Sequence, residues 1–406
     1  MTNCRRQRLI DVSVSPRTAI AGNRILSYIL NEFEQIPASV YAMPSTTVTP
    51  TTVAPATVAP ATPSFAARWV SRLSWTNLCL MMVISWLLFA ISENWWFSSA
   101  MTYAPRIPYL VPAIVLLLAS GLWHRSSILI NLISIAVVAV PIMGLALPVG
   151  QWTGSTPAAA SPSAGTVLKV VSCNVQDFRP DFEAVITEIG KFNPDVVAFQ
   201  DARSQSKLLS KFFTKWHTVH EGEYFVASRY PVTLVKLGHF DSFDRDAIMQ
   251  CELELPTTRV SFFNVHQMTP RHGLRELDLS SPITQRGSTR LTHYLELRAE
   301  EAEAVRAFVE ENRGTLPTIL VGDFNMPCES SLYQRHWFGY QNAFNVAGTG
   351  YGYSFPCTRQ YCWPAGLPWM RLDHILADDA WNIRSCKVGQ SNGSDHRPIT
   401  ATIELR

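Results

Sequence analysis

Three long stretches in the first half of the chain contain no charged residue, and they limit the possible folds more than any other feature. They are Leu73–Ser92, Ile107–Trp123 and Ser127–Val149. Each is close to the roughly 20 apolar residues that an α-helix needs to cross the hydrocarbon core of a bilayer. The alternative is three helices buried in a soluble protein, where uncharged runs of this length are costly to cover. The sequence therefore predicts three transmembrane α-helices within residues 73–149, in an integral membrane protein.

Charged residues beside these stretches predict the orientation of the chain. Arg68 and Arg72 precede the first stretch, and Arg125 separates the second from the third. The loop between the first two stretches carries Arg106, which Glu93 partly offsets. Basic residues collect on the cytoplasmic side of membrane proteins. We therefore expect a cytoplasmic N-terminus and an extracytoplasmic C-terminal domain, in the cell or inner membrane.

The overall charge conceals two unlike parts. The whole chain has 34 Lys and Arg and 32 Asp and Glu, a net charge of +2. Residues 1–167 hold nine arginines and four acidic residues, a net charge of +5, and residues 168–406 have a net charge of −3. Residues 1–72, with a Thr/Ala/Pro-rich stretch at Met43–Pro63, predict a largely disordered tail, and residues 150–166 predict a flexible linker. The remainder, residues 167–406, is long enough for one soluble domain with a substantial core.

Many short runs in this domain are rich in β-branched residues and predict strands. They lie at residues 168–173, 195–199, 224–227, 232–237, 249–255, 260–265, 318–321, 372–376 and 399–403. Two segments have helical spacing of apolar residues, Asp181–Phe192 and Glu296–Asn312. Many strands with few helices between them predict two packed sheets covered by helices.

Acids, amides and histidines stand at the ends of these predicted strands. They are Asn174, Gln200, Asp201, Asn264, His266, Asp323, Asn325, Asp373, Asp395 and His396. Taken singly, such a residue is more often a cap or a turn former. Taken together, they are expected to converge on one edge of the sheets. Their oxygen-rich side chains suit Mg²⁺ or Mn²⁺, which retain waters and bind phosphate.

The order and spacing of these residues resemble the endonuclease/exonuclease/phosphatase superfamily, which includes deoxyribonuclease I-like nucleases, apurinic-site endonucleases, sphingomyelinases and inositol-polyphosphate phosphatases. The matching motifs are SCNVQDF (172–178), DVVAFQDA (195–202), SRYPV (228–232), NVH (264–266), GDFNMP (322–327), RLDHIL (371–376) and SDHRPI (394–399). The resemblance covers nearly all of residues 168–406 and none of the preceding part. It implies a four-layered α/β sandwich, in which two packed mixed sheets are flanked by helices. It also implies phosphoester hydrolysis that depends on a divalent metal, Mg²⁺ or Mn²⁺.

Hydrolysis at such a site needs a positioned water, a base, and groups that stabilise the phosphoryl oxygens. His396 is the expected base, because imidazole titrates near neutral pH without a large shift of its pKa. By resemblance, Asp373 orients His396, and Asp323 positions the attacking water. Asn325 is expected to donate a hydrogen bond to a phosphoryl oxygen, and His266 to do so from the opposite side.

The resemblance also implies a set of metal-binding and supporting residues. Asn174, Asp201 and Asp395 are expected to hold or orient the metal ion. The superfamily usually has Glu where this chain has Asp201, whose side chain is one methylene shorter, so direct contact with the metal would need a shift or a bridging water. Arg229 and Glu223 are candidates for supporting His266 and the floor of the substrate site; the alternative for both is a solvated charge pair on a sheet edge.

Cysteines in an exported domain are compatible with disulfide bonds. Cys357 and Cys362 flank a four-residue loop and form the best candidate pair among the domain's six cysteines. Ordinary buried thiols are the alternative.

The sequence says least about the substrate. A net charge of −3 predicts no general basic surface for duplex DNA, although a local patch is compatible with it. The segment Arg271–Arg290 carries four arginines that could contact phosphates or form a solvated loop. Tyr361, Trp363 and Trp369 could stack on bases or dip into a bilayer surface.

Three hypotheses follow from these observations. The leading one is a membrane-anchored, metal-dependent phosphodiesterase or nuclease. The second is a phosphatase or phospholipase C-like enzyme that acts on lipid head groups or small phosphoesters. The third, from another class, is a non-catalytic membrane receptor that binds a phosphorylated ligand.

Overall fold

A computed structural model of the chain describes residues 64–147 and 165–406, apart from residues 180, 242–243, 278–285, 360–362 and 392. All of these residues belong to one compact unit, Thr62–Arg406. The expectations for the tail before residue 64, for most of the 150–166 linker and for Cys362 lie outside the described residues.

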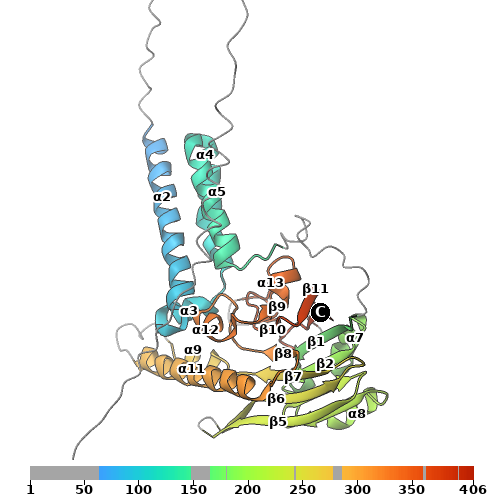
Figure 1. Cartoon of the computed structure of the whole chain (residues 1–406). Helices are drawn as coiled ribbons and strands as arrows, with labels where there is room; N and C mark the ends of the chain where they lie inside the picture. The colour runs from blue at the N-terminus through green and yellow to red at the C-terminus, as the bar shows by residue number, and fades with distance from the viewer. Residues whose placement is uncertain are drawn as a thin grey trace, which may run out of the picture. The chain divides into compact units, whose positions relative to one another are not determined.

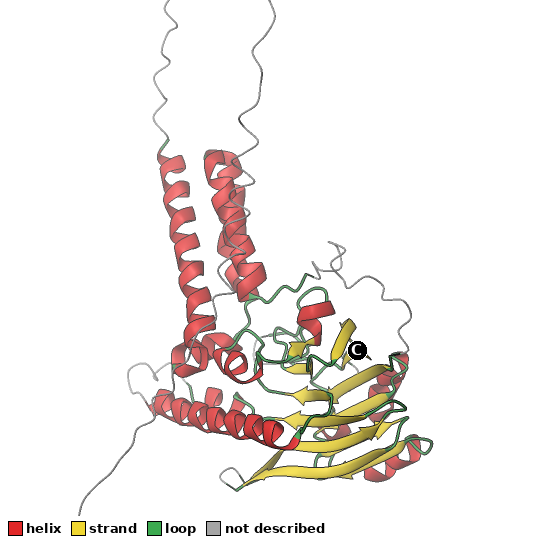
Figure 2. Cartoon of the chain, viewed as in Figure 1, coloured by secondary structure: helices red, strands yellow, loops and turns green. Residues whose placement is uncertain are grey.

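The C-terminal part is built on two six-stranded sheets (Figures 1 and 2). The first has the order β11 (Trp381–Val388), β12 (Ile399–Leu405), β1 (Val167–Asn174), β2 (Val196–Gln200), β4 (Tyr224–Ser228) and β3 (His217–Glu221). The second has the order β5 (Val232–Phe240), β6 (Arg245–Glu254), β7 (Arg259–His266), β8 (Thr318–Asp323), β10 (Asp373–Ala377) and β9 (Gln341–Asn342). Each sheet is mixed, because β1 runs parallel to β2 and β7 parallel to β8, while the other neighbours are antiparallel.

Buried side chains from both sheets form a shared core. Residues such as Val170 and Val226 of the first sheet pack with Phe262 and Ile375 of the second, all of them almost fully excluded from solvent. This pattern follows from the β-branched and aromatic composition of the strands, whose side chains fit a pleated, buried surface. The sheets therefore pack face to face.

Helices cover the outer faces of the two sheets. The first sheet packs on α7 (Phe182–Lys191) and α8 (Ser206–Phe212), and the second on α11 (Arg286–Asn312) and α12 (Ser331–Trp337). The short helices α9 (Arg271–Arg275) and α13 (Ala343–Ala347) complete this part. Two mixed sheets flanked by helices confirm the predicted α/β sandwich.

The described N-terminal part consists of apolar α-helices joined by short helical segments, which are labelled η. In chain order they are α2 (Phe65–Trp86), η1 (Leu87–Ile91), η2 (Ser92–Asn94), α3 (Trp96–Tyr103), η3 (Ile107–Tyr109), α4 (Leu110–Trp123), η4 (Arg125–Ser127), α5 (Ile128–Val137) and η5 (Val138–Ile142). Two continuous helices, Phe65–Asn94 and Arg125–Ile142, are long and apolar enough to cross a membrane. A third candidate is a pair bent by 95°, Trp96–Tyr103 and Ile107–Trp123.

The boundaries of these helices correct the sequence-based expectation. The first helix begins at Phe65, within the segment predicted to be a disordered tail up to residue 72. The second predicted span, Ile107–Trp123, is one arm of the bent pair rather than a separate long helix. The third helical stretch ends at Ile142, before the predicted end at Val149.

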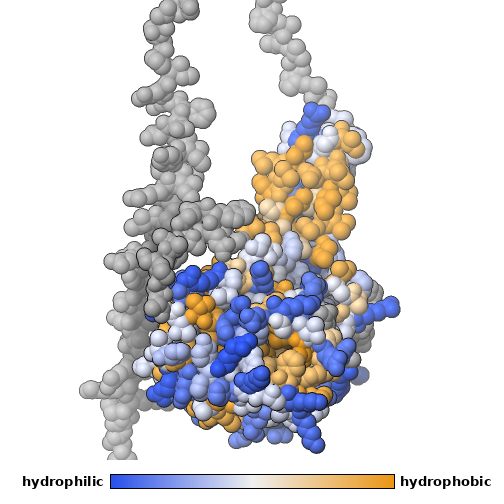
Figure 3. Space-filling model, turned by 90° about the vertical axis from the view of Figure 1, so that its right-hand side faces the viewer, coloured by the Kyte–Doolittle hydropathy of each residue, from blue (hydrophilic) through white to orange (hydrophobic). Residues whose placement is uncertain are grey.

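Many large hydrophobic side chains of these helices are exposed, as Figure 3 shows for one side of them. They include Leu80, Val83, Val111, Val115, Leu118, Leu122, Leu129, Leu132 and Ile133. A polar contact holds the helices together behind this surface. The Asn131 side chain of α5 donates to the hydroxyl of Ser74 in α2 at 2.9 Å and to that of Ser120 in α4 at 2.8 Å. The buried Asn131 amide therefore links α2, α4 and α5.

We expect Asn131→Leu to lower the free energy of unfolding by about 1–3 kcal/mol, because it removes two interhelical hydrogen bonds. Thermal unfolding of the purified chain in detergent measures the loss. Ser134→Ala is the matched control, since the Ser134 hydroxyl donates within its own helix to Ile130 O. An Asn131→Leu chain as stable as the control would contradict this role for the amide.

Candidate active site

The ends of several strands from both sheets supply one group of polar side chains. Asn174 pairs with Gln200 across β1 and β2, His266 pairs with Asp323 across β7 and β8, and Asp373 pairs with Asp323 across β8 and β10. This register places the polar ends of the strands at the same edge. The predicted convergence of strand ends is therefore present in the structure.

A histidine and two carboxylates lie at the centre of this group. His396 Nδ1 lies 2.8 Å from Asp373 Oδ2, and His396 Nε2 lies 3.6 Å from Asp323 Oδ2. All three residues are at least 96% buried. Burial opposes protonation of His396, but the carboxylates of Asp373 and Asp323 outweigh it and raise its pKa to about 10. A cation bound beside these carboxylates would act in the opposite direction.

Two asparagines fix the orientation of Asp323. Asn174 Nδ2 donates to Asp323 Oδ2 at 3.0 Å, and the backbone N–H of Asn325 donates to Asp323 Oδ1 at 3.0 Å. Asn325 adopts a left-handed conformation with φ of 53°, which asparagine tolerates better than most residues. Burial raises the pKa of Asp323, although His396 opposes the shift. The carboxylate is thus held by directed hydrogen bonds.

His266 lies next to Asn174 and Asp323, on the opposite side of the site from His396. Its Nε2 lies 3.5 Å from Asn174 Nδ2 and 3.9 Å from Asp323 Oδ2, and its Nδ1 lies 2.7 Å from Glu223 Oε1. Burial disfavours the charged form of His266, but the Glu223 carboxylate outweighs it and raises the pKa. Arg245 also approaches Glu223 Oε1 at 3.5 Å. The structure therefore brings Glu223 into the position that supports His266.

Arg229 was also a candidate support for His266, and the structure corrects this expectation. Glu223 and Arg229 flank opposite ends of β4. Arg229 Nε donates to Pro194 O at 3.0 Å, and its guanidinium lies over the Trp216 ring at 4.6 Å. At roughly 3.3 Å per residue, the strand carries Arg229 well away from the site.

Asp201 lies at the site edge but faces outward. Its side chain is about one third exposed, and its Oδ1 lies 4.0 Å from Arg203 Nε. The backbone φ of Asp201 is 51°, which turns the chain sharply after β2. Its predicted role as a metal ligand stays a prediction.

Glu223→Gln is expected to lower kcat/KM for a phosphoester about 10-fold, because His266 loses the charge that favours its protonated form. Steady-state kinetics of the purified chain measure the change. Arg229→Gln serves as the control at the far end of β4 and is expected to stay within twofold of wild type. Equal effects of the two substitutions would contradict the assigned role of Glu223.

Three further residues reach the site, and of these the sequence pointed only to Arg271. Arg271 Nη2 lies 3.3 Å from Asp395 Oδ2, and Arg298 Nη2 donates to Asn325 O at 2.6 Å. Tyr103, in α3, places its hydroxyl 3.5 Å from the same Asn325 oxygen. Arg271 carried a signal in its arginine-rich segment. Tyr103 carried none, because it lies in the part that the resemblance does not cover.

The donor atoms of the site suit a hard divalent cation. Asp323, Asp373 and His396 offer donor atoms that lie within 4.8 Å of one another. Asp373 Oδ1 is buried without a hydrogen-bond partner among the described residues. Asn174 and the buried Asp395 add oxygen donors nearby, which gives the oxygen-rich, negatively charged set that Mg²⁺ and Mn²⁺ prefer. The residues present therefore fit the group that the resemblance implies.

Several solved structures are similar to this chain. An endonuclease/exonuclease/phosphatase family protein from Bacteroides thetaiotaomicron is 14% identical; the match covers 60% of this chain and 99% of that one, with a TM-score of 0.43. The 3'-5' exonuclease from Neisseria meningitidis is 18% identical; the match covers 58% of this chain and 98% of that one, with a TM-score of 0.41. An AP endonuclease from Archaeoglobus fulgidus is 16% identical; the match covers 58% of this chain and 98% of that one, with a TM-score of 0.42. No curated protein sequence matches the chain.

A protein-family model also matches the sequence. The model of the Endonuclease/Exonuclease/phosphatase family matches residues 171–396, more than half of the chain. This range runs from β1 to the buried histidine and contains the predicted catalytic and metal-binding residues. The chain belongs to the Endonuclease/Exonuclease/phosphatase family, a family of phosphoester hydrolases.

Proposed function

We propose that this protein is a membrane-anchored phosphodiesterase that depends on Mg²⁺ or Mn²⁺. The observation that carries the proposal is the buried His396–Asp373 pair, whose free imidazole nitrogen faces Asp323 at 3.6 Å. A histidine oriented by a carboxylate and aimed at a second carboxylate is suited to activate a water.

The chain's own side chains divide the work of hydrolysis. Asp373 holds His396 through Nδ1 and directs Nε2 at the attacking water. Positive charge beside the carboxylates lowers the raised pKa of His396, so that neutral Nε2 can accept the proton of this water. Asp323 accepts a hydrogen bond from the same water and fixes its position. The water oxygen forms a bond to phosphorus while the P–O bond to the leaving alcohol breaks.

Donor groups around the phosphoryl oxygens stabilise the charge that develops there. Protonated His266 donates from Nε2, because its Nδ1 is engaged by Glu223. The Asn325 side-chain amide donates to Gln267 O at 2.8 Å and to Asp323 Oδ2 at 3.1 Å, and it would donate to a phosphoryl oxygen from the other side by redirecting one of these hydrogen bonds. Preorganised donors of this kind are worth roughly 10²–10³ in rate each. Asn174 and Asp395 would hold a divalent cation, and Asp201, whose side chain faces outward, would reach it through a bridging water or after a shift. The cation would supply positive charge to the phosphoryl and leaving-group oxygens when bound.

Membrane anchoring rests on the N-terminal helices. Their exposed surface is hydrophobic, and two of them are long enough to cross a bilayer, or three if the bent pair forms one span. We propose three spans, with the N-terminus in the cytoplasm and the catalytic domain on the extracytoplasmic side, from the arginines that flank the spans. Extraction of membranes with alkaline carbonate should leave the protein in the pellet. Release into the supernatant would refute integral anchoring.

The catalytic proposal is tested with the full chain purified in detergent. DNA, RNA, sphingomyelin, inositol phosphates and bis(p-nitrophenyl) phosphate are each offered with Mg²⁺, with Mn²⁺ or with chelator. Hydrolysis that requires the metal supports the proposal, and equal hydrolysis with chelator contradicts its metal dependence. Hydrolysis of none of these substrates, together with no metal binding, would favour the alternative of a phospho-ligand receptor.

A further inference from the structure

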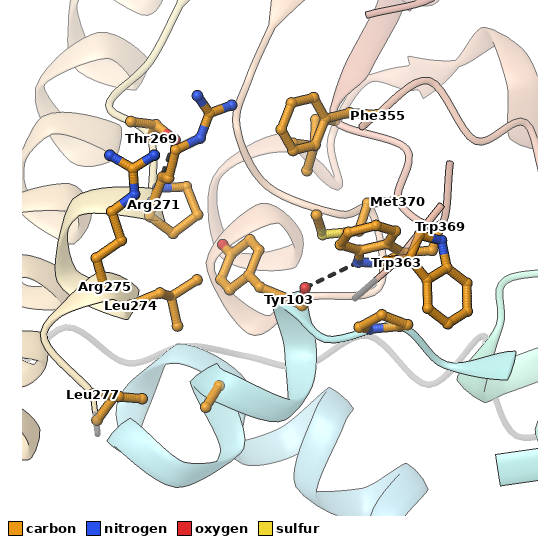
Figure 4. A pocket seen from close by; sticks show the side chains of 14 residues that line it. Tyr103, Thr269, Arg271, Leu274, Arg275, Leu277, Phe355, Trp363, Trp369 and Met370 are labelled. Atoms are coloured by element: carbon orange, nitrogen blue, oxygen red, sulfur yellow. Dashed lines mark hydrogen bonds between the residues drawn. The ribbon is translucent and has the colours of Figure 1, made fainter. Parts of the chain in front are cut away.

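A cavity of about 560 Å³ lies beside the candidate active site. Its walls come from three parts of the chain, as Figure 4 shows: α3 with Tyr103, α9 with Leu274, and the segment before β10 with Trp363 and Trp369. Apolar side chains make up most of the lining, which also includes Ala100, Pro105, Pro270, Leu277, Phe355, Met370 and Leu372. The cavity is therefore shaped by aromatic and aliphatic groups.

This cavity adjoins the catalytic side chains directly. The Phe355 ring, which lines it, lies 4.6 Å from the His396 ring between centroids. Arg271, also in the lining, lies over the Phe355 ring at 5.2 Å and contacts Asp395 Oδ2 at 3.3 Å. A molecule with its phosphate at His396 would thus extend its next group past Phe355 into the cavity.

The N-terminal helices contribute one wall, and hydrogen bonds fasten this wall to the catalytic domain. Trp369 Nε1 donates to Tyr103 O at 3.0 Å. The Tyr103 hydroxyl donates to Glu93 Oε1 at 2.9 Å, and Glu93 Oε2 in turn accepts from the Ser331 hydroxyl of α12 at 3.3 Å. The cavity is therefore incomplete without the helices that we propose to lie in the membrane.

We propose that this cavity binds the hydrocarbon chain of a lipid phosphodiester whose phosphate is cleaved at the catalytic centre. The inference rests on the proposed function and names its substrate class. Buried methylene groups gain free energy from an apolar lining of this kind. Arg271 and Arg275, both in the lining, supply positive charge next to the phosphate. A lipid phosphodiester has both features, an anionic phosphate and an adjacent hydrocarbon chain.

The position of the cavity favours a lipid over a nucleic acid. Its α3 wall begins beside Trp95, which is 45% exposed and has the amphipathic ring typical of a membrane interface, and α3 itself exposes the apolar ring of Phe97 to 43%. Residues 168–406 carry a net charge of −3, which repels a polyanion. The cavity shares its α3 wall with the bent helix pair that we propose as one of the spans, so it lies next to the part of the chain expected in the bilayer.

Three phosphodiesters with the same leaving group test the proposal: methyl, dodecyl and thymidine-5' p-nitrophenyl phosphate. Each is offered to the full chain reconstituted in phosphatidylcholine nanodiscs. Water attacks phosphorus, p-nitrophenolate leaves, and the alkyl or nucleoside phosphate remains. We expect kcat/KM for the dodecyl ester to exceed that for the methyl ester about 100-fold. At roughly fourfold per buried methylene, this gain corresponds to about three to four methylenes of the chain held in the cavity.

Filling the cavity separates binding in it from simple partition into the bilayer. Ala100→Trp narrows the cavity from the α3 side, and Leu274→Trp narrows it from the α9 side. Either variant should lower the ratio of dodecyl to methyl kcat/KM at least tenfold. Ala184→Trp, on α7 over the other sheet, is the matched control and should keep the wild-type ratio. Because partition affects all of these proteins alike, the ratio reports the cavity.

Each other outcome overturns a defined part of the account. A dodecyl preference that persists in both filled variants refutes the cavity as its source. A preference for the thymidine ester that the filled variants abolish assigns the cavity to a nucleobase instead. Similar hydrolysis of all three esters refutes the lipid inference and leaves the proposed function standing, whereas hydrolysis of none refutes the proposed function itself.

Discussion

Replacing His396 with alanine is expected to lower kcat/KM for a phosphodiester about 10³-fold. The imidazole lies 2.8 Å from Asp373 through Nδ1 and presents Nε2 to Asp323 at 3.6 Å, so the substitution removes the base of the proposed mechanism. Steady-state hydrolysis of bis(p-nitrophenyl) phosphate by the purified chain measures the loss. The circular dichroism spectrum should match that of the wild type.

A second histidine–aspartate pair provides the control for this substitution. His239 Nδ1 lies 3.0 Å from Asp246 Oδ1, at a site where about half of the imidazole is exposed. His239→Ala removes the same chemical group from a surface pair and should leave kcat/KM within twofold of the wild type. Activity that survives His396→Ala within tenfold of wild type would remove His396 from the role of base.

The second large effect is expected for Asp323→Asn, which should lower kcat about 10²–10³-fold, the typical cost of losing one transition-state contact. The amide keeps the shape of the side chain but loses the charge that positions the water. Asp378→Asn is the matched control, because Asp378 Oδ2 accepts from the Thr318 N–H at the opposite end of β8. Full activity in Asp323→Asn would contradict the assignment.

Asp323→Asn should lower the activity but should not lower the stability of the fold. Burial raises the pKa of Asp323 above its usual value, so its charged form is disfavoured in the folded state. For an acid whose folded pKa is raised, stability falls as pH increases from the unfolded value through the folded one. In chelator at pH 7 the Asn variant should therefore be at least as stable as the wild type. A lower melting temperature at that pH would contradict this account of the buried charge.

The sequence predicted the central strands well because their composition matches their environment. Runs such as VVAFQ in β2 are buried along their whole length, and the β-branched signal is strong there. It missed the edge strands β3, β9 and β11. None of the five positions of β3 is fully buried, β9 has only two residues, and β11 alternates buried residues with polar ones. The sequence also placed the start of α11 ten residues late, because RGSTRLTHYL carries little helical periodicity.

The active-site residues at strand ends were predictable from the sequence. The residues that reach the site only through the packing of helices or loops were not. His396, Asp373 and Asp323 follow or begin buried strands, so topology alone brings them together. Tyr103 reaches Asn325 across more than two hundred residues of chain, through a contact that depends on how α3 docks. Arg229 and Glu223 flank the same short strand in the sequence, but the length of β4 keeps the two side chains apart.

Attack of water on phosphorus at this site is the central claim, and hydrolysis in H₂¹⁸O tests it most directly. The full chain hydrolyses dodecyl p-nitrophenyl phosphate with Mg²⁺ or Mn²⁺, and mass spectrometry locates the label. The account predicts one ¹⁸O atom in the dodecyl phosphate and none in the p-nitrophenol. Label in the p-nitrophenol, or the absence of hydrolysis with either metal, would contradict it.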